Sequence, residues 1–447
     1  MKNKAVRDVA LDILLQIEKN QAYSNLLLNQ MIHKNNLNQK DIGLLTEIVY
    51  GTIQRQFTLD YYLESFIVNK KKVEPWVIIL LRLSIYQMVY LDRIPAHAVI
   101  NEAVEIAKKR GHRGISGMVN GVLRSVQRKG LPNTIDIDDP IERLSIQVSY
   151  PKWLIEKWVQ QFGLDETRKM CENSLIPPSV TARVNSTRTT IEEIISLLQK
   201  ETITAEQGDL SVDAIKIVKG NLTKSTPFNE GLVTIQDESS MLVARALDVL
   251  PNQMILDSCA APGGKTTHIA ELLNGSGKVV AVDLHPHKVK LIEEQLNRLR
   301  LSNVETRVSD SRKLRELFEP ETFDRILVDA PCSGFGVIRR KPDIKYSKTA
   351  NDVKGLASIQ LSILDSIAPL LKKGGKLVYS TCTIDPEEND GVVEQFLHSH
   401  PEYTYDESLI DRMPQHVRPL TKEGRLQILP HYFGSDGFFI ASFRKQV

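Results

Sequence analysis

The chain has 447 residues, 42% of them hydrophobic, which is enough for two or three domains with substantial cores. It contains no apolar run of the roughly 18 residues that a membrane span requires, and its charged start, Met1-Lys2-Asn3-Lys4, does not resemble a signal peptide. We therefore expect a soluble, cytoplasmic protein with no membrane partner, whose four cysteines are thiols rather than disulfides.

The net charge of +2 conceals an uneven distribution. Residues 1–140 carry 19 Lys and Arg against 14 Asp and Glu, so the remainder of the chain is slightly acidic. The most basic stretch opposes a single acidic residue, Glu105, to seven cations: Lys108, Lys109, Arg110, Arg113, Arg124, Arg128 and Lys129. Such a block is either a solvated helical face or a surface for nucleic-acid phosphates, and the two interpretations have equal weight here.

The first zone of the chain is helical in its pattern. Apolar residues recur at helical spacing from Ala5 to Ile17 and again from Val99 to Ala107, and few segments alternate as strands do. We predict an all-α domain over residues 1–135. The acidic, turn-rich stretch 130–140 has no helical periodicity and is predicted to be a linker.

Residues 143–235 combine both periodicities and predict a small α+β module. The predicted helices are Trp153–Phe162 and Ile191–Leu198, and the predicted strands are Thr181–Asn185, Ala214–Val218 and Leu232–Ile235.

From residue 236 to 447, strand-like runs alternate with helices, which predicts a mostly parallel sheet covered on both faces. The strands are Met254–Asp257, Val279–Asp283, Val304–Val308, Ile326–Asp329 and Leu377–Ser380. The helices between them include Thr267–Leu273, Lys288–Leu299 and Leu356–Leu371. A final pair, Leu426–Leu429 and Gly437–Phe443, predicts an antiparallel hairpin at the sheet edge.

The first of these strands runs into a turn of small residues and glycines, which lets a ligand approach the backbone closely. The turn comprises Ser258, Cys259, Ala260, Ala261, Pro262, Gly263, Gly264 and Lys265. Gly264-Lys265-Thr266 resembles the end of a phosphate-binding P-loop, but that motif requires a glycine where Cys259 stands. The sequence therefore disfavours a P-loop.

Four strands end in or near an aspartate, namely Asp257, Asp283, Asp310 and Asp329. A single aspartate after a strand is usually a cap or turn residue. Four around one glycine-rich turn instead indicate a nucleoside site, with Asp283 on the ribose hydroxyls and Asp310 on the adenine amino group. We predict an adenosine-type cofactor bound without phosphate recognition, and S-adenosylmethionine is the obvious candidate.

Two cysteines follow strand ends, Cys332 in Asp329-Ala330-Pro331-Cys332 and Cys382 in Ser380-Thr381-Cys382-Thr383. A thiolate that adds to carbon 6 of cytosine makes carbon 5 nucleophilic enough to accept a methyl group. An acid must then support N3, and Asp329 is placed for this if a semi-buried site keeps it protonated. One thiol would add and the other would assist elimination, an assignment that this chemistry leaves open.

At these residues the chain resembles the RNA 5-methylcytosine methyltransferases. The matching elements, in order, are the Asp257–Thr266 turn, Asp283, Asp310, the Asp329–Gly334 loop and the Ser380–Thr383 loop. The resemblance implies that Cys382 is the nucleophile and that Cys332 serves product release, whereas DNA cytosine methyltransferases use the Pro-Cys thiol to attack.

The resemblance extends along the whole chain. A NusB-like helical domain, an RNA-recognition-like module and a Rossmann-like methyltransferase domain form the layout of the 16S ribosomal RNA methyltransferase B family (Sun/Fmu). The basic loop Arg339–Tyr346 also matches, and its charges suit an RNA backbone. The resemblance implies a cytosine of 16S rRNA as substrate, presented unstacked, and we expect a monomer.

Three alternatives remain. The first is the same chemistry on tRNA or another rRNA. The second is an RNA-binding assembly factor with an idle site, which the presence of Asp329, Cys332 and Cys382 disfavours. The third is a thiol-bound zinc ion, for which no C-x-x-C motif or nearby His pair is present, so no metal is expected.

Overall fold

The computed structural model describes residues 5–20 and 24–447, so residues 1–4, part of the evidence against a signal peptide, lie outside it. The chain forms two compact units. The first comprises residues up to Ile176 together with the separate segment Arg340–Ser347, and the second comprises Pro177–Arg339 and Lys348–Val447.

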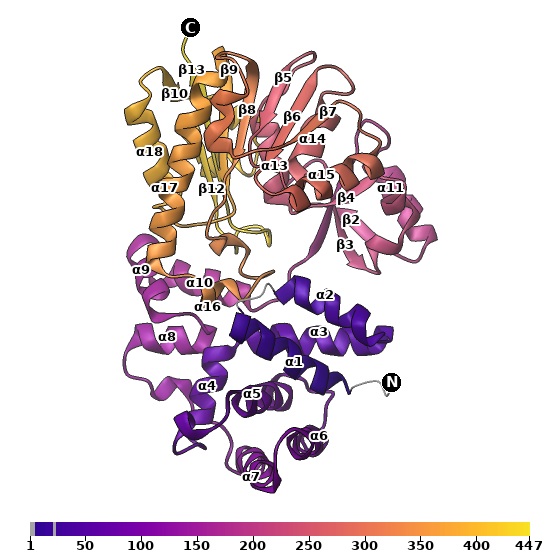
Figure 1. Ribbon diagram of the computed structural model, residues 1–447, viewed down its shortest axis with the longest axis vertical. Helices are drawn as coiled ribbons and strands as arrows, with labels where there is room; N and C mark the ends of the chain where they lie inside the picture. Colours follow the sequence, from indigo (N-terminus) through magenta and orange to yellow (C-terminus); the bar gives the residue numbers. More distant parts are fainter. Residues whose placement is uncertain (1–4, 21–23) are drawn as a thin grey trace. The chain divides into compact units, whose positions relative to one another are not determined.

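The first unit consists of helices, with no strand among its described residues (Figure 1). Its helices are α1 (Val6–Asn20), α2 (Ser24–Asn35), α3 (Gln39–Gln54), α4 (Gln56–Glu64), α5 (Pro75–Tyr90), α6 (Ala96–Arg110), α7 (Arg113–Lys129), α8 (Pro140–Val148), α9 (Lys152–Phe162), α10 (Leu164–Ser174) and α16 (Ile344–Ser347). Helix α5 is apolar around nearly its whole circumference and is buried from Val77 to Gln87, as expected of a central core helix. The predicted all-α domain is confirmed.

The two compact units do not coincide with the predicted domains, because the first unit extends to Ile176 rather than to residue 135. The predicted domain limits stay predictions. The stretch 130–140 contains one 3-10 turn, η2 (Thr134–Asp136), and leads directly into α8. Asp139 caps α8 by accepting a hydrogen bond from the Ile141 amide, and Pro140 occupies its first turn. These signals start α8, and α8, α9 and α10 all belong to the first unit.

The second unit begins with a small α+β module, as predicted. Its elements are β1 (Val180–Val184), α11 (Ile191–Lys200), β2 (Thr204–Gln207), β3 (Ala214–Lys219), α12 (Thr226–Asn229) and β4 (Val233–Ile235). The strands form an antiparallel sheet in the order β2-β3-β1-β4. Strand β2, which the sequence analysis missed, is mostly exposed at the sheet edge and so lacks an apolar pattern.

The rest of the second unit is a mixed α/β domain built on a nine-stranded sheet. Its strands are β5 (Met254–Asp257), β6 (Lys278–Asp283), β7 (Val304–Val308), β8 (Phe323–Asp329), β9 (Leu371–Thr381), β10 (Tyr403–Tyr405), β11 (Thr421–Lys422), β12 (Arg425–Ile428) and β13 (Phe438–Lys445). Its helices are α13 (Glu238–Ala246), α14 (Gly264–Leu272), α15 (Pro286–Leu299), α17 (Ala350–Ile367), α18 (Asp390–Ser399) and α19 (Leu409–Arg412).

The strand order is β11-β12-β13-β9-β8-β5-β6-β7, and the five strands from β9 to β7 are parallel. The predicted pair β12 and β13 is antiparallel, but β13 lies inside the sheet because it also pairs with β9. Helix α17 begins six residues before the predicted start because Thr349 and Asp352 form a capping box. It runs beside α18 (Figure 1).

Strand β5 is the topological switch point of the sheet, where the order in which successive strands are added reverses. It pairs with β6 on one side and with β8 on the other, although β6 and β7 come between β5 and β8 in the chain. In parallel sheets a crevice opens beyond the carboxyl ends of strands at such a point, and ligands bind there. The glycine-rich turn after β5 therefore lies where a ligand site is expected.

A buried ion pair ties the small module to the helix that follows this turn. Arg183, on β1, makes a two-pronged contact with Glu271 of α14, with distances of 2.9 Å and 3.0 Å, and both side chains are almost completely buried. Arg183 also donates to the Gly264 carbonyl oxygen at 2.8 Å. The first turn of α14 is thus held from the module side.

We predict that Arg183→Met lowers the free energy of unfolding of the second unit by about 3–5 kcal/mol, because the Glu271 carboxylate stays buried without its counter-ion. Urea denaturation followed by circular dichroism measures this. All three tryptophans lie in the first unit, so their fluorescence follows that unit separately. The double variant Arg183→Met/Glu271→Leu should recover most of the loss, and an equally unstable double variant would contradict the explanation.

Candidate active site

The turn between β5 and α14 has the geometry of a ligand-binding loop. Gly263 adopts a φ of +101°, which side chains other than glycine rarely tolerate. A Cβ there would also lie 3.3 Å from the Ile292 backbone. The Asp283 carboxylate, at the end of β6, accepts hydrogen bonds from the amides of Ala261 and His285, both at 3.2 Å. Asp283 thus joins the turn to the neighbouring strand.

The edge beside Asp283 suits an adenosine group. Leu284, which follows it, and Val308, at the end of β7, are each about half exposed, at 51% and 50%. Two exposed apolar side chains next to a carboxylate offer a surface for a flat base and an acceptor for hydroxyl groups. These three side chains fit an adenosine-type cofactor.

Two more of the four aspartates, Asp257 and Asp310, already have hydrogen-bond partners within the protein. Asp257 is fully buried and accepts a hydrogen bond from the Thr266 hydroxyl at 2.6 Å, so it stabilises the turn from below. Asp310 caps the 3-10 helix η4 (Ser311–Glu316) and pairs with Arg312 at 2.6 Å. Its contact with an adenine amino group stays a prediction.

The two cysteine loops come together. Strands β8 and β9 are parallel neighbours in which Asp329 lies opposite Ser380. The loops that leave them bring the Cys332 and Cys382 sulfur atoms to 3.5 Å, and both residues are half-buried. All four cysteines are thiols rather than disulfides, as predicted. A substrate atom that reaches one thiol is therefore within reach of the other.

Asp329 lies between the glycine-rich turn and the thiol loops. Its Oδ2 is 2.8 Å from the Lys265 ammonium, and its Oδ1 accepts a hydrogen bond from the Ser380 hydroxyl at 2.9 Å. Lys265 comes from α14, and Ser380 comes from the strand that leads to Cys382. Asp329 thus joins the predicted cofactor turn to the predicted nucleophile loop.

The charges around the two thiols differ. The hydrogen bond with Cys382 and burial raise the pKa of Cys332 well above its usual value, and the carboxylates of Glu388 and Asp329 add to this effect. Burial alone would lower the pKa of Lys265, but Asp329 and Cys382 raise it overall, which keeps the ammonium charged. The hydrogen bond with Cys382, burial and the nearby carboxylates therefore favour the protonated form of Cys332, and a cation favours negative charge on Cys382.

The interpretation of the loop Arg339–Tyr346 as a basic surface for RNA is wrong for Lys345. This side chain is completely buried in the first unit, where it donates to the Gln54 carbonyl oxygen at 2.7 Å and lies over the Tyr150 ring. Burial lowers the pKa of Lys345 well below its usual value. Arg339, in the second unit, donates to the carbonyl oxygens of Gly434 and Pro177. The sequence shows the charges but not their burial.

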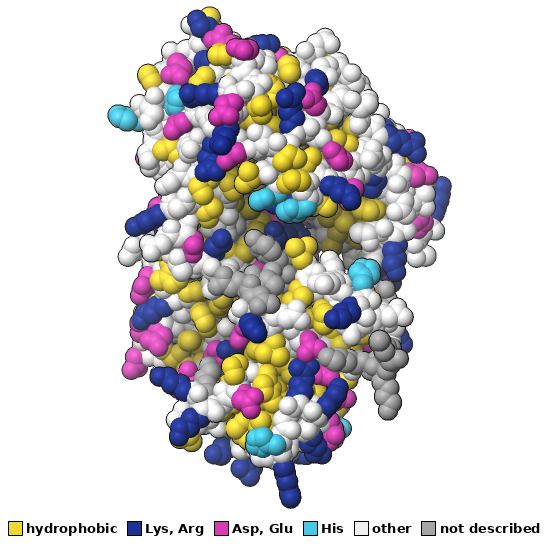
Figure 2. Space-filling view, viewed as in Figure 1, with side chains coloured by type: hydrophobic (Ala, Val, Ile, Leu, Met, Phe, Trp, Pro, Cys, Tyr) yellow, Lys and Arg dark blue, Asp and Glu magenta, His cyan; other side chains and the backbone are white. Residues whose placement is uncertain are grey.

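The basic block of the first unit is split by internal ion pairs. Lys109 and Arg110 contact Asp8, which is buried, and Arg110 also contacts Asp12. The exposed cations on α7 are Arg113, Arg124, Arg128 and Lys129. In Figure 2, Lys and Arg side chains gather at the end of this unit where α6 and α7 lie. This surface suits phosphate groups.

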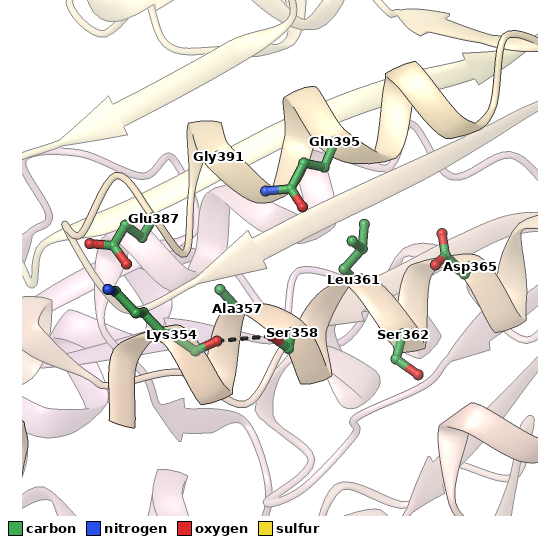
Figure 3. Close-up of a pocket in the computed structure, with 9 residues that line it drawn as sticks. All are labelled: Lys354, Ala357, Ser358, Leu361, Ser362, Asp365, Glu387, Gly391 and Gln395. Carbon is green, nitrogen blue, oxygen red and sulfur yellow. Dashed lines mark hydrogen bonds between the residues drawn. The ribbon is translucent and has the colours of Figure 1, made fainter. Parts of the chain in front are cut away.

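A surface cavity of about 440 Å³ lies between α17 and the start of α18, and no cysteine is among the residues that line it (Figure 3). Lys354, Asp365, Glu387 and Gln395 contribute most of its polar groups. No predicted site residue lines it. The described part of the chain holds no cluster of metal-binding side chains and no helix with the length and apolar character of a membrane span.

The sequence analysis overlooked two residues of this region. Glu388 and Gln360 are fully buried and contact the Cys332 loop. One signal was available for Glu388, because it belongs to an acidic run that directly follows a buried strand and the Cys382 loop. Gln360 carried no signal, because it lies in the middle of a helix.

Comparisons with known proteins identify the family and the fold. Residues 244–444 match the family described as 16S rRNA methyltransferase RsmB/F. Residues 4–128 match the NusB family, and residues 150–222 match the ferredoxin-like domain of RsmF/B-like methyltransferases. The predicted fold class, with its NusB-like domain, small α+β module and methyltransferase domain, is confirmed.

Full-length relatives give the same result. A probable ribosomal RNA small subunit methyltransferase B from Bacillus subtilis is 56% identical over 446 residues and covers 100% of both chains. One from Synechocystis is 35% identical and covers 99% of both. The crystal structure of PH0851 superposes with a TM-score of 0.83 at 27% identity and covers 100% of this chain and 99% of that chain.

We predict that the stability of the second unit depends on the protonation of Asp257. Burial raises the pKa of Asp257 to about 7 from an ordinary 3.8. The folded chain therefore holds a proton that the unfolded chain loses, so this contribution is complete below about pH 4 and is lost as pH rises to about 7. Its size is on the order of 4 kcal/mol.

Urea denaturation of wild type and Asp257→Asn between pH 4 and pH 8 tests this. The variant keeps an oxygen for Thr266 and carries no titrating group, so its stability should fall less over this range. Parallel pH profiles for the two proteins would contradict the prediction.

Proposed function

Because the chain belongs to the 16S rRNA methyltransferase RsmB/F family, we propose that it methylates carbon 5 of one cytosine in 16S rRNA through a covalent bond from Cys382 to carbon 6. Membership alone makes it an S-adenosylmethionine-dependent methyltransferase of small-subunit rRNA with a NusB-type RNA-binding domain. The observation that carries the finer proposal is the pair of thiols, 3.5 Å apart, beside Asp329.

The cofactor would bind over the turn Cys259–Lys265, with its ribose on Asp283 and its adenine between Leu284 and Val308, toward Asp310. When bound, S-adenosylmethionine supplies an electrophilic methyl group. The turn and Asp283 are already hydrogen-bonded to each other at 3.2 Å, so they need little rearrangement to receive a nucleoside. Asp329, at the end of the adjacent strand β8, would lie between the cofactor and the target cytosine.

Cys382 is the proposed nucleophile. Its sulfur shares a hydrogen bond with the Cys332 thiol, and the nearby Lys265 ammonium favours the thiolate. When the thiolate adds to carbon 6, one electron pair of the ring moves toward carbon 5 and negative charge develops at N3. A base still paired in a helix would hide carbon 6, so the cytosine must be unstacked.

Asp329 is the proposed acid at N3. Lys265 donates to its Oδ2 at 2.8 Å, so the pair together holds a proton that Asp329 can present to N3 and Lys265 can replace. Ser380 donates to Oδ1 and fixes the orientation of the carboxyl group. After methylation, a water molecule takes the carbon 5 proton, and the electron pair left behind restores the ring double bond as the bond from carbon 6 to the Cys382 sulfur breaks. N3 returns its proton to the Asp329–Lys265 pair, and Cys332, held in its protonated form, can give a proton to the departing sulfur.

Two other functions are possible outcomes of the same assay. The first is the same chemistry on tRNA or another rRNA, and the second is RNA binding without methylation, as in an assembly factor. The match of residues 4–128 to the NusB family supports an RNA partner. The matched relatives are named for the small ribosomal subunit, which supports 16S rRNA.

We predict that Cys382→Ala loses methyl transfer to unmodified 16S rRNA by at least about 10³-fold, because no group replaces the covalent nucleophile. In the Cys332→Ala variant, Cys382 should still attack the base, but the product should be released slowly, which leaves RNA covalently bound to the protein. Labelled S-adenosylmethionine measures the transfer, and a denaturing gel shows the adduct as a retarded band.

Cys171→Ala provides a matched control, since this thiol is buried in the first unit and belongs to no proposed site, and it should leave methyl transfer unchanged. An active Cys382→Ala with an inactive Cys332→Ala would reverse the two roles. Transfer to tRNA but not to 16S rRNA, or RNA binding with no transfer by wild type, would favour one of the two alternatives.

We further predict that Lys265→Met reduces single-turnover methylation by about 10²-fold to 10⁴-fold, the usual contribution of acid catalysis. The loss follows because Asp329 has no cation beside it to supply the proton. Lys265→Arg keeps the charge at a different distance and should retain more activity. Saturating cofactor separates this effect from weaker binding, and equal rates for wild type and Lys265→Met would contradict the proposed acid.

A further inference from the structure

A completely buried carboxylate lies against the Cys332 loop. Glu388 is 0% exposed, and its Oε2 accepts a hydrogen bond from the Ser333 amide at 2.8 Å. The same oxygen accepts a second hydrogen bond from the Gln360 side chain at 3.0 Å. Glu388 thus grips the residue that directly follows the proposed release cysteine.

Gln360 holds the other side of the same turn. It lies on α17, is also completely buried, and donates from Nε2 to the Pro331 carbonyl oxygen at 2.9 Å. The residues before and after Cys332 are therefore both bonded to one buried pair. Because the backbone is held on both sides, the Cα–Cβ bond of Cys332 is held as well, and the thiol can reach only the positions that rotation about this bond allows.

Glu388 itself is anchored to the strand that carries Cys382. The Tyr379 hydroxyl, on β9, donates to the Glu388 carbonyl oxygen at 2.6 Å. The Ser333 and Thr383 hydroxyls, 2.8 Å apart, form a second link between the two loops. Glu388 therefore links the Cys332 turn to β9, the strand that leads to Cys382.

This arrangement is costly for stability alone. Burial raises the pKa of Glu388, so keeping its charge opposes folding. Glu388 Oε1 and Gln360 Oε1 are buried and have no hydrogen-bond partner within the described part of the chain. An apolar pair of similar volume would be cheaper to bury. A pair that lowers stability but orients a reactive turn is typical of a functional region.

We propose that Glu388 and Gln360 are positioning residues that hold the Cys332 turn so that its thiol stays beside Cys382 during product release. The inference rests on the proposed function, which assigns release to Cys332. It extends that function by naming side chains that touch neither the base nor the cofactor and act only through the turn.

The contacts indicate that release, rather than attack, depends on this pair. The Cys382 loop has supports of its own, because Thr381 donates to Asn389 at 2.6 Å and Asn389 donates to the Thr383 carbonyl oxygen at 3.1 Å. Loss of the Glu388 carboxylate leaves these bonds in place and frees the Ser333 amide. Cys382 should still add to the base, while Cys332 no longer meets the adduct correctly.

The test is Glu388→Ala with unmodified 16S rRNA and labelled S-adenosylmethionine. We expect the first equivalent of RNA to be methylated, the covalent adduct to accumulate as in Cys332→Ala, and steady-state turnover to fall by about 10-fold to 100-fold, the effect of a misplaced catalytic group. A variant that had merely unfolded would form no adduct, so the adduct distinguishes positioning from general damage.

Two substitutions serve as controls. Glu388→Gln keeps an oxygen for the Ser333 amide, and its new N–H groups can satisfy the unpartnered Gln360 oxygen, so we expect turnover within a few-fold of wild type. Glu387→Gln makes the same change one residue earlier, at the cavity in Figure 3, and should leave turnover and adduct unchanged.

The remaining outcomes separate this inference from the proposed function. If Cys332→Ala traps RNA but Glu388→Ala turns over like wild type, the positioning role is overturned while the proposed function stands. If wild type methylates no cytosine, or Cys332→Ala traps nothing, the proposed function fails first. Should Glu388→Ala not fold, Gln360→Ala removes the Pro331 contact instead, and normal release by that variant would also overturn the inference.

Discussion

The parallel pairing of β8 with β9 is the interaction on which the site depends. Its register sets Asp329 opposite Ser380, and each strand then continues for two or three residues to a cysteine. Backbone hydrogen bonds in the core of the sheet therefore bring together the two loops in which the sulfur atoms lie 3.5 Å apart. A shift of one residue would turn the side chains of one strand to the opposite face and separate Asp329, Cys382 and Cys332.

Once the two thiols are adjacent, their surroundings make them different. Cations favour the thiolate, and carboxylates and burial favour the thiol. Lys265 and Glu388 have opposite effects. Lys265 favours the thiolate of Cys382, and Glu388 favours the thiol of Cys332. The proposed division of labour between two identical groups would thus follow from the charges around them, as in other enzymes that assign an acid and a base to paired residues of one type.

Buried polar contacts hold this region together where apolar packing alone would leave it loosely defined. Arg183 and Glu271 fix α14 behind the glycine-rich turn, and Glu388 with Gln360 fixes the turn around Cys332. Each pair lowers the gain from burial, because charged or amide groups lose their hydration. In return, each defines one geometry, since hydrogen bonds have directions that apolar contacts lack.

Much of this was already determined by the sequence. Periodicity revealed the helical zone and the parallel strands, because buried strands and helices need regular apolar residues, and short motifs marked Lys265, Asp329 and both cysteines. Only the tertiary structure decided that Lys345 is buried, that β13 lies inside the sheet, and that Glu388 and Gln360 contact the Cys332 turn. The physical reason is that burial and partners of polar groups depend on segments far apart in the chain, which local pattern does not encode.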